Sequence, residues 1–164
     1  MESWERVLRR EIRRSARVAV VGIGNVARGD DAAGTLAARA LLAGPGMLPA
    51  KALVIPAEEA PENFTGVIRA FSPDLAVLVD SAAAGWPPGA VFLVDPAEIA
   101  DEDVSTHRVP LTRLAFYIRE TMDCRVLILG IGPSSFEEGA PVSPVVGRAI
   151  RKVVATLRSA LDAA

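Results

Sequence analysis

The fold is decided by the stretch Val18-Ala-Val-Val-Gly-Ile-Gly-Asn-Val-Ala-Arg-Gly-Asp-Asp-Ala-Ala-Gly34. It begins with a β-branched, apolar run, turns at a Gly-x-Gly-Asn element, and continues through two aspartates into an Ala/Leu-rich segment with helical spacing. This order predicts a buried strand, a tight turn and a helix. Either aspartate could accept hydrogen bonds from the free N–H groups of the helix, and we interpret Asp30 as this N-cap. The Asp31 carboxylate is then left to point into the crevice at the end of the strand, where it would attract a cation or a proton.

The segments that follow alternate between strand and helix patterns. The apolar run at 75–79 indicates a strand buried on both faces, as in the parallel sheet of an α/β protein. The turn at 85–89 is too short for a helical crossover, so the strand at 90–94 should run antiparallel at an edge. We predict strands at 18–21, 52–55, 75–79, 90–94 and 125–131, and helices at 2–15, 31–43, 64–71, from Pro110 onward and at 144–163. The sequence therefore predicts one α/β domain over residues 1–164, a doubly wound, mostly parallel five-stranded sheet with helices on both faces and one antiparallel edge strand.

Composition limits the possible partners. The chain has 164 residues, of which 51% are hydrophobic, and a formal net charge of −2, so it lacks the basic field that attracts nucleic acid. Cys124 is the only cysteine, so an internal disulfide is impossible and nothing suggests a thiolate metal site; a reducing, cytoplasmic setting is expected. No stretch approaches the roughly 20 apolar residues of a membrane span, and the apolar run behind the N-terminal arginines is too short for an export signal. We expect a small ligand or a protein as partner, and a monomer.

Three polar residues fall at the edge of the predicted sheet where a ligand crevice would lie. Asp31 follows the first strand, Asp80 ends the third, and His107 lies in the loop before the helix at Pro110. Two carboxylates and an imidazole are ligands of borderline hardness that suit Ni, Zn, Mn or Fe and leave coordination positions open. Because it has no thiolates, this set should bind a metal weakly. It is better suited to sensing a metal that a partner carries than to keeping its own.

Each of these residues also has a structural interpretation. Asp31 could complement the dipole of the following helix, Asp80 could end a strand and begin a turn, and His107 could be a surface residue. The Gly22-x-Gly24-x-x-Ala27 pattern could instead belong to a dinucleotide-binding fold. Two aspartates stand where the pyrophosphate would lie, and the strand at 52–55 is followed by Pro56 rather than by an acid. We therefore rank metal binding above nucleotide binding.

Seven short motifs occur in order between about residues 17 and 160. They are Gly22-Ile-Gly-Asn-Val-Ala-Arg-Gly-Asp-Asp-Ala-Ala-Gly34, Ala60-Pro-Glu-Asn63, Pro73-Asp-Leu-Ala-Val-Leu-Val-Asp-Ser81, Pro88-Gly89, Asp95-Pro96, Ser105-Thr-His-Arg-Val-Pro-Leu111 and Leu129-Gly-Ile-Gly-Pro133. Together they resemble the [NiFe]-hydrogenase maturation endopeptidases, of the hydrogenase-3 maturation protease type.

The resemblance implies an endopeptidase that removes a C-terminal extension from a hydrogenase large-subunit precursor after nickel has been inserted. It also implies that Asp31, Asp80 and His107 contact this nickel, which the precursor carries, and that no organic cofactor is involved. Residues 17–164 would form the protease core, and the amphipathic helix within residues 1–16 would be an extension beyond it. A non-catalytic nickel-sensing or metallochaperone relative stays open, because such a protein would keep the same three residues.

The chain departs from the family pattern in two places. Ala32 stands where many relatives have glycine, and Pro56-Ala-Glu-Glu59 replaces a glycine-rich turn. Glu58 and Glu59 could tune metal preference or partner choice, or they could be ordinary surface charge, which we favour. The identity of the general base is not evident from the sequence.

Overall fold

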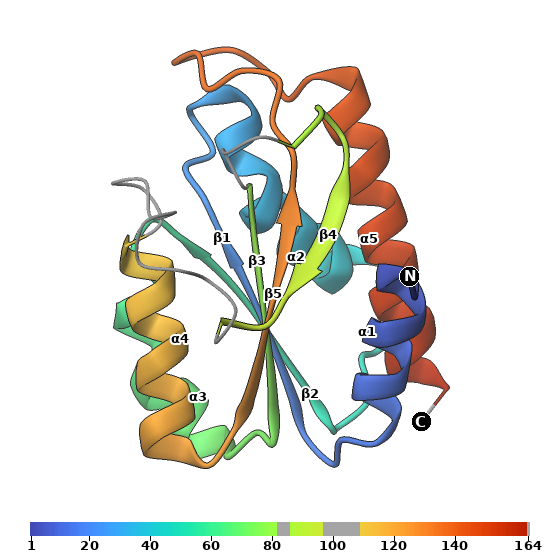
Figure 1. Ribbon diagram of the computed structural model, residues 1–164, viewed down its shortest axis with the longest axis vertical. Coiled ribbons are helices and arrows are strands. Elements are labelled where there is room, and N and C mark those ends of the chain that lie inside the picture. Colours follow the sequence, from blue (N-terminus) through green and yellow to red (C-terminus); the bar gives the residue numbers. More distant parts are fainter. Residues whose placement is uncertain (82–85, 97–108, 164) are drawn as a thin grey trace.

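The computed structural model describes residues 1–81, 86–96 and 109–163. These residues form a five-stranded sheet with helices on both faces, which confirms the predicted α/β architecture (Figure 1). The elements in chain order are α1 (Trp4–Arg13), β1 (Val18–Ile23), the 3₁₀ turn η1 (Gly29–Ala32), α2 (Ala33–Ala43), β2 (Ala52–Glu58), the 3₁₀ turn η2 (Pro61–Phe64), α3 (Thr65–Phe71), β3 (Leu75–Ser81), β4 (Val91–Val94), α4 (Val109–Met122), β5 (Arg125–Ile131) and α5 (Pro144–Asp162).

The order of the strands in the sheet creates the position for a ligand. It is β2-β1-β3-β5-β4, with β1, β2, β3 and β5 parallel and β4 antiparallel to β5, as predicted for the edge strand. From β1 the chain goes to β2 on one side and then returns to β3 on the other side. The carboxyl ends of β1 and β3 therefore meet where the strand order reverses, which is where open α/β sheets bind their ligands.

The two faces of the sheet carry separate hydrophobic cores. Helices α1, α2 and α5 cover one face, and α3 and α4 cover the other (Figure 1). Successive side chains of a strand point to opposite faces, so Val77 packs in the first core and Leu78 in the second. Both residues are fully buried, which explains why the strand pattern is apolar without alternation.

Glycines let α2 approach the sheet unusually closely. A Cβ atom on Gly34 would lie 2.0 Å from the carbonyl oxygen of Val79 and 2.3 Å from that of Ile23. A Cβ atom on Gly22, in β1, would lie 2.1 Å from the carbonyl oxygen of Gly34. Because the backbones of α2, β1 and β3 touch here, the first residues of the helix are held directly above the ends of the two strands.

β2 is longer than the sequence pattern indicated. We expected a strand at 52–55 followed by a loop at 56–63, but β2 continues through Pro56 to Glu58. Pro56 pairs with Gly22, and the register then shifts so that Ile23 pairs with Glu58. The prediction was wrong because it took Pro56 to end the strand, as proline usually does. β2 is an edge strand, so one of its sides has no neighbouring strand to which a backbone N–H group must donate, and proline is tolerated there.

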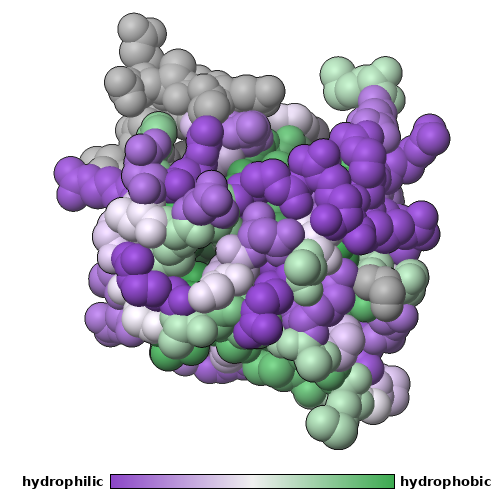
Figure 2. Space-filling model, turned by 90° about the horizontal axis from the view of Figure 1, so that it is seen from below, coloured by the Kyte–Doolittle hydropathy of each residue, from purple (hydrophilic) through white to green (hydrophobic). Residues whose placement is uncertain are grey.

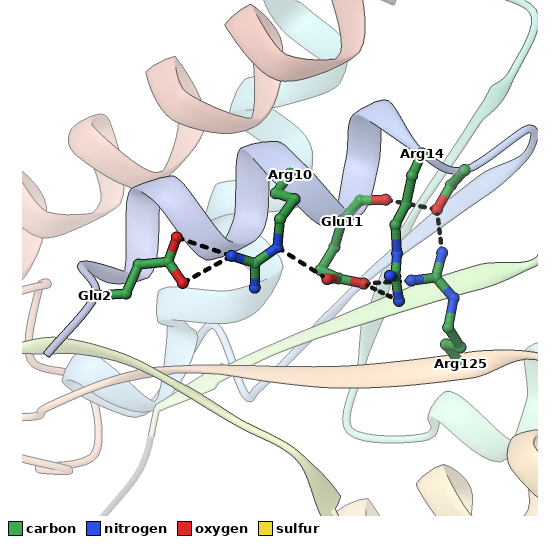
Figure 3. Close-up of polar contacts among 6 residues, drawn as sticks. Glu2, Arg10, Glu11, Arg14 and Arg125 are labelled. Carbon is green, nitrogen blue, oxygen red and sulfur yellow. Dashed lines mark hydrogen bonds and ion pairs between the residues drawn. The ribbon is translucent and has the colours of Figure 1, made fainter.

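The N-terminal helix is attached to the sheet by charge as well as by apolar packing. Leu8 and Ile12 are fully buried in the first core. The Glu11 carboxylate, only 12% exposed, pairs with Arg10, Arg14 and Arg125, and Arg125 is the first residue of β5 (Figure 3). This network fixes α1 to the edge at which β5 begins. The division into a 1–16 extension and a 17–164 core stays a prediction.

The opposite side of α1 faces solvent. The side chains of Arg10 and Arg14 are 53% and 57% exposed. Figure 2 shows hydrophilic side chains gathered on the side of the molecule where α1 lies. Among the described residues no helix is both long enough and apolar enough to cross a membrane.

Candidate active site

Asp31 lies directly above the end of β1. It belongs to the 3₁₀ turn η1, which carries the chain from the strand into α2, and its side chain is half-buried. The backbone N–H of Asn25 donates to its Oδ2 at 3.2 Å, and the hydroxyl of Ser81 donates to its Oδ1 at 3.4 Å. Both contacts hold the carboxylate at the sheet edge while part of it stays open to a ligand.

Asp80 is the next-to-last residue of β3. It is half-buried, although Leu75 to Val79 before it and Ser81 after it are buried. Its Oδ1 accepts a hydrogen bond from the backbone N–H of Ser81 at 2.8 Å. Ser81 therefore contacts both acids, Asp80 through its backbone and Asp31 through its hydroxyl. The structure thus places two of the predicted site residues at the carboxyl ends of the neighbouring strands β1 and β3, where Ser81 links them.

His107 lies outside the described residues. The chain resumes at Val109, the first residue of α4. Because α4 leads back to the start of β5, its N-terminus lies at the edge where β1 and β3 end (Figure 1). Within the described ranges, no three His, Cys, Asp or Glu side chains are arranged to hold a metal ion.

Asp30 has a different role from the one predicted. We expected it to be the N-cap of the helix at 31–43, but the first turn of α2 has no side-chain cap. Its carboxylate, 1% exposed, reaches instead to the segment between β5 and α5. Oδ2 accepts from the backbone N–H groups of Ser134 (2.8 Å) and Ser135 (3.2 Å), and Oδ1 accepts from the N–H (2.8 Å) and hydroxyl (3.0 Å) of Ser143.

These contacts explain why a carboxylate can be buried here. Burial alone would raise the pKa of Asp30, but hydrogen bonds from Ser143, Ser134 and Ser135 outweigh it and hold the pKa below its ordinary value. Ser143 also precedes α5, so the negative charge lies at the positive end of that helix dipole. The backbone N–H of Asp30 donates to the carbonyl of Ser135 at 2.9 Å. Asp30 therefore fixes the backbone from which the neighbouring Asp31 side chain projects.

The two extra glutamates, Glu58 at the end of β2 and Glu59 after it, make different contacts. Glu58 pairs with Arg39 of α2 at 2.7 Å, with both side chains about half exposed, as expected for surface charge. Glu59 accepts a hydrogen bond from the side-chain amide of Asn25 at 2.8 Å, and the backbone of Asn25 holds Asp31. Asn25 and Ser81 were not predicted as contacts of Asp31. The only signal for them is their position, just after β1 and at the end of β3.

The lone cysteine is not part of this site. Cys124 is buried just before β5, at the opposite end of the strands from Asp31. Burial raises the pKa of its thiol to about 11. A thiol with that pKa is almost fully protonated at neutral pH and is a poor nucleophile.

Comparisons with known proteins agree with one another. A family model described as hydrogenase maturation protease matches residues 40–160. The hydrogenase 3 maturation protease of Escherichia coli K12 is 33% identical over 132 residues, covering 80% of this chain and 82% of that protein. A putative hydrogenase maturation protease of Methanocaldococcus jannaschii is 28% identical over 152 residues, covering 90% and 89%. The crystal structure of the [NiFe] hydrogenase maturation protease HycI from Thermococcus kodakarensis superposes with a TM-score of 0.87 at 33% identity, covering 95% of this chain and 99% of that one.

Proposed function

The chain belongs to the hydrogenase maturation protease family, and on that premise we propose that it removes the C-terminal extension of a [NiFe]-hydrogenase large-subunit precursor after nickel insertion. Membership makes it a hydrolase, specifically a peptidase. It argues against the two alternatives drawn from the sequence, a non-catalytic nickel-sensing protein and a nucleotide-binding protein. The precursor and its nickel are both substrate in this proposal, and no organic cofactor takes part.

The proposal is supported by one observation: Asp31 and Asp80 lie at the carboxyl ends of the neighbouring strands β1 and β3, where the strand order reverses, and Ser81 contacts both. Both carboxylates are half-buried at this crevice, and imidazole and carboxylate oxygen suit a borderline ion such as nickel. We assign nickel recognition to Asp31, Asp80 and His107, the last of which precedes the first residue of α4 by two positions. Nickel held mainly by the precursor docks against this set and positions the scissile bond.

The chemistry is peptide hydrolysis. A water oxygen attacks the carbonyl carbon, the C–N bond breaks, and the proton lost by the water is delivered to the leaving amine. The bound nickel or an acidic group beside it polarises the carbonyl or activates the water. Cys124 cannot replace these groups as nucleophile, because its thiol is buried and protonated.

Substitutions at the site test this assignment. In Asp31→Asn the new amide oxygen can accept from the backbone N–H of Asn25, and the Ser81 hydroxyl can turn to accept from the new amide NH₂ group, so the fold should survive while the charge is lost. We expect cleavage of a nickel-loaded precursor, followed by intact-mass spectrometry, to fall by about 100-fold or more in Asp31→Asn and Asp80→Asn and to be abolished in His107→Ala.

Asp162→Asn is the matched control. Asp162 pairs with Arg158 near the end of α5, and its side chain is 49% exposed. This variant should cut at the wild-type rate, and circular dichroism should show all four variants folded. Normal processing by Asp31→Asn or His107→Ala would remove that residue from the site.

We further propose that the protein acts in the cytoplasm as a monomer. A single buried cysteine suits a reducing compartment, because nothing in the fold depends on a disulfide. Sedimentation of the purified protein at micromolar concentration checks the oligomeric state, and cell fractionation checks the compartment.

A further inference from the structure

A groove of about 620 Å³ lies between the start of α3 and the first turns of α4. Its volume is within the roughly 300–1,000 Å³ of ligand pockets in proteins. One wall comes from η2 and its flanks, and the other from α4. The lining residues are Glu59, Glu62, Thr65, Arg113, Leu114 and Tyr117.

This groove is joined to the candidate active site through Asn25. The backbone N–H of Asn25 donates to Asp31, and its side-chain amide donates to Glu59, at 3.2 and 2.8 Å. α3 follows β2 and α4 leads into β5, so both helices begin at the edge of the sheet where Asp31 lies (Figure 1). A chain whose scissile bond is held beside Asp31 can therefore continue into the groove.

The charges in the groove are unevenly distributed. Glu58, the neighbour of Glu59, is neutralised by Arg39 outside the groove. Glu62 and Arg113 form no ion pair with any residue in the described ranges, and Glu59 is bonded only to the neutral Asn25 there. Glu59 and Glu62 together give one wall two carboxylates that no described cation neutralises. Such a wall is complementary to a Lys or Arg side chain.

The opposite wall, formed by α4, carries Leu114 and Tyr117 beside Arg113 and is held rigidly. Leu114 is buried, and Tyr117 presents a ring with 42% of its surface exposed. The guanidinium of Arg69 in α3 donates to the Tyr117 hydroxyl at 2.6 Å and to the Thr121 hydroxyl at 3.2 Å. These bonds hold α4 against α3, so the groove is formed before any ligand enters. A preformed surface loses little entropy on binding an extended chain.

We propose that this groove binds the precursor segment next to the scissile bond and that Glu59 and Glu62 receive a basic side chain of that segment. The inference rests on the function proposed above and adds to it the kind of sequence that is recognised. Glu59 and Glu62 select the substrate, whereas Asp31 and Asp80 take part at the reacting centre. Arg113 on the facing wall is complementary to an acidic side chain of the bound segment.

Steady-state kinetics with a nickel-loaded precursor that the wild type cuts provide the test. We expect Glu62→Gln, and more strongly the Glu59→Gln/Glu62→Gln double variant, to raise KM by about tenfold or more with kcat within about threefold. Glu58→Gln, which alters an adjacent carboxylate outside the groove, should leave both constants unchanged. An unchanged KM in the double variant, or an equal rise in Glu58→Gln, would overturn the inference.

Charge exchange makes the test specific. In the precursor, the Lys and Arg residues within four positions of the cleavage site can be replaced by Glu. This change should raise KM for the wild-type enzyme, and the enzyme variant Glu62→Lys should bring the KM for the altered precursor back down. Anisotropy of a fluorescein-labelled peptide spanning the cleavage site measures the groove without cleavage. If the wild type did not cut the precursor but peptide binding still depended on Glu62, the proposed function would be rejected. The inference that the groove binds a basic peptide segment would still stand. If Glu62→Lys altered sedimentation but not peptide binding, the groove would be a contact between two copies and the inference would be wrong.

Discussion

Asp30→Asn should destabilise the protein without touching substrate. The Asp30 carboxylate is 1% exposed and accepts from three backbone N–H groups and one hydroxyl. An asparagine oxygen can keep the bonds from Ser134 and Ser135, and the Ser143 hydroxyl can turn to accept from the new amide. The backbone N–H of Ser143 then faces another donor. One buried unsatisfied N–H costs about 1–3 kcal/mol, and loss of charge from the remaining bonds adds about 1 kcal/mol, so we expect about 2–4 kcal/mol in total.

The assay is urea unfolding followed by circular dichroism, with thermal unfolding beside it. A loss of about 2–4 kcal/mol in a chain of this size corresponds to a Tm lower by roughly 4–16 °C. Asp162→Asn serves as control, because its exposed pair with Arg158 should contribute less than about 0.5 kcal/mol. A change below about 0.5 kcal/mol in Asp30→Asn would show that these hydrogen bonds do not stabilise the fold as argued.

The loss of stability in Asp30→Asn should depend on pH. The pKa of Asp30 is lower in the folded protein than its ordinary value of 3.8, so the carboxylate stabilises the fold above that value. This contribution is lost as the pH falls through the folded pKa. The difference in unfolding free energy between wild type and Asp30→Asn should therefore be constant near neutral pH and shrink below about pH 4. A difference that grows on acidification would contradict the assignment.

Three further predictions concern the scaffold. Gly34→Ala should cost about 3 kcal/mol or fail to fold, because its Cβ would lie 2.0 Å from the Val79 carbonyl; a wild-type midpoint in urea would refute the close approach. Glu11→Gln should lower the unfolding free energy by about 1–2 kcal/mol, since Arg125 loses its partner, and the loss should shrink in high salt. Native Cys124, with a pKa of about 11, should react with a disulfide reagent at pH 8 about 100-fold more slowly than in urea; equal rates would mean that the thiol is exposed.

Periodicity was sufficient to predict the sheet. The apolar run before Asp80 and the Gly-x-Gly-Asn turn before Asp31 identified the central parallel strands, and the short connection before β4 identified the antiparallel edge. Parallel strands align their carboxyl ends, so residues that follow two such strands meet once the strands are neighbours. For this reason local pattern predicts that Asp31 and Asp80 lie at the same end of the sheet, whereas the pairing of β1 with β3 is a property of the whole fold.

The contacts that support the site could not be predicted in this way. Asp30 bonds to Ser143, which is 113 positions further along the chain, and no local signal distinguishes that role from an N-cap. Continuation of β2 through Pro56 depends on β2 being an edge strand, which is a property of the whole sheet. The difference between Glu58 and Glu59 arises because their side chains meet Arg39 and Asn25, which the fold brings alongside them.

The central claim is that nickel in the precursor is what Asp31 and Asp80 recognise. The most direct measurement is the rate of C-terminal cleavage, followed by intact-mass spectrometry, for the same large-subunit precursor with nickel inserted and without it. We expect the wild type to release a C-terminal peptide only from the nickel-loaded precursor, and Asp31→Asn to release it about 100-fold more slowly or not at all. Equal cleavage of the nickel-free precursor by the wild type would contradict the account.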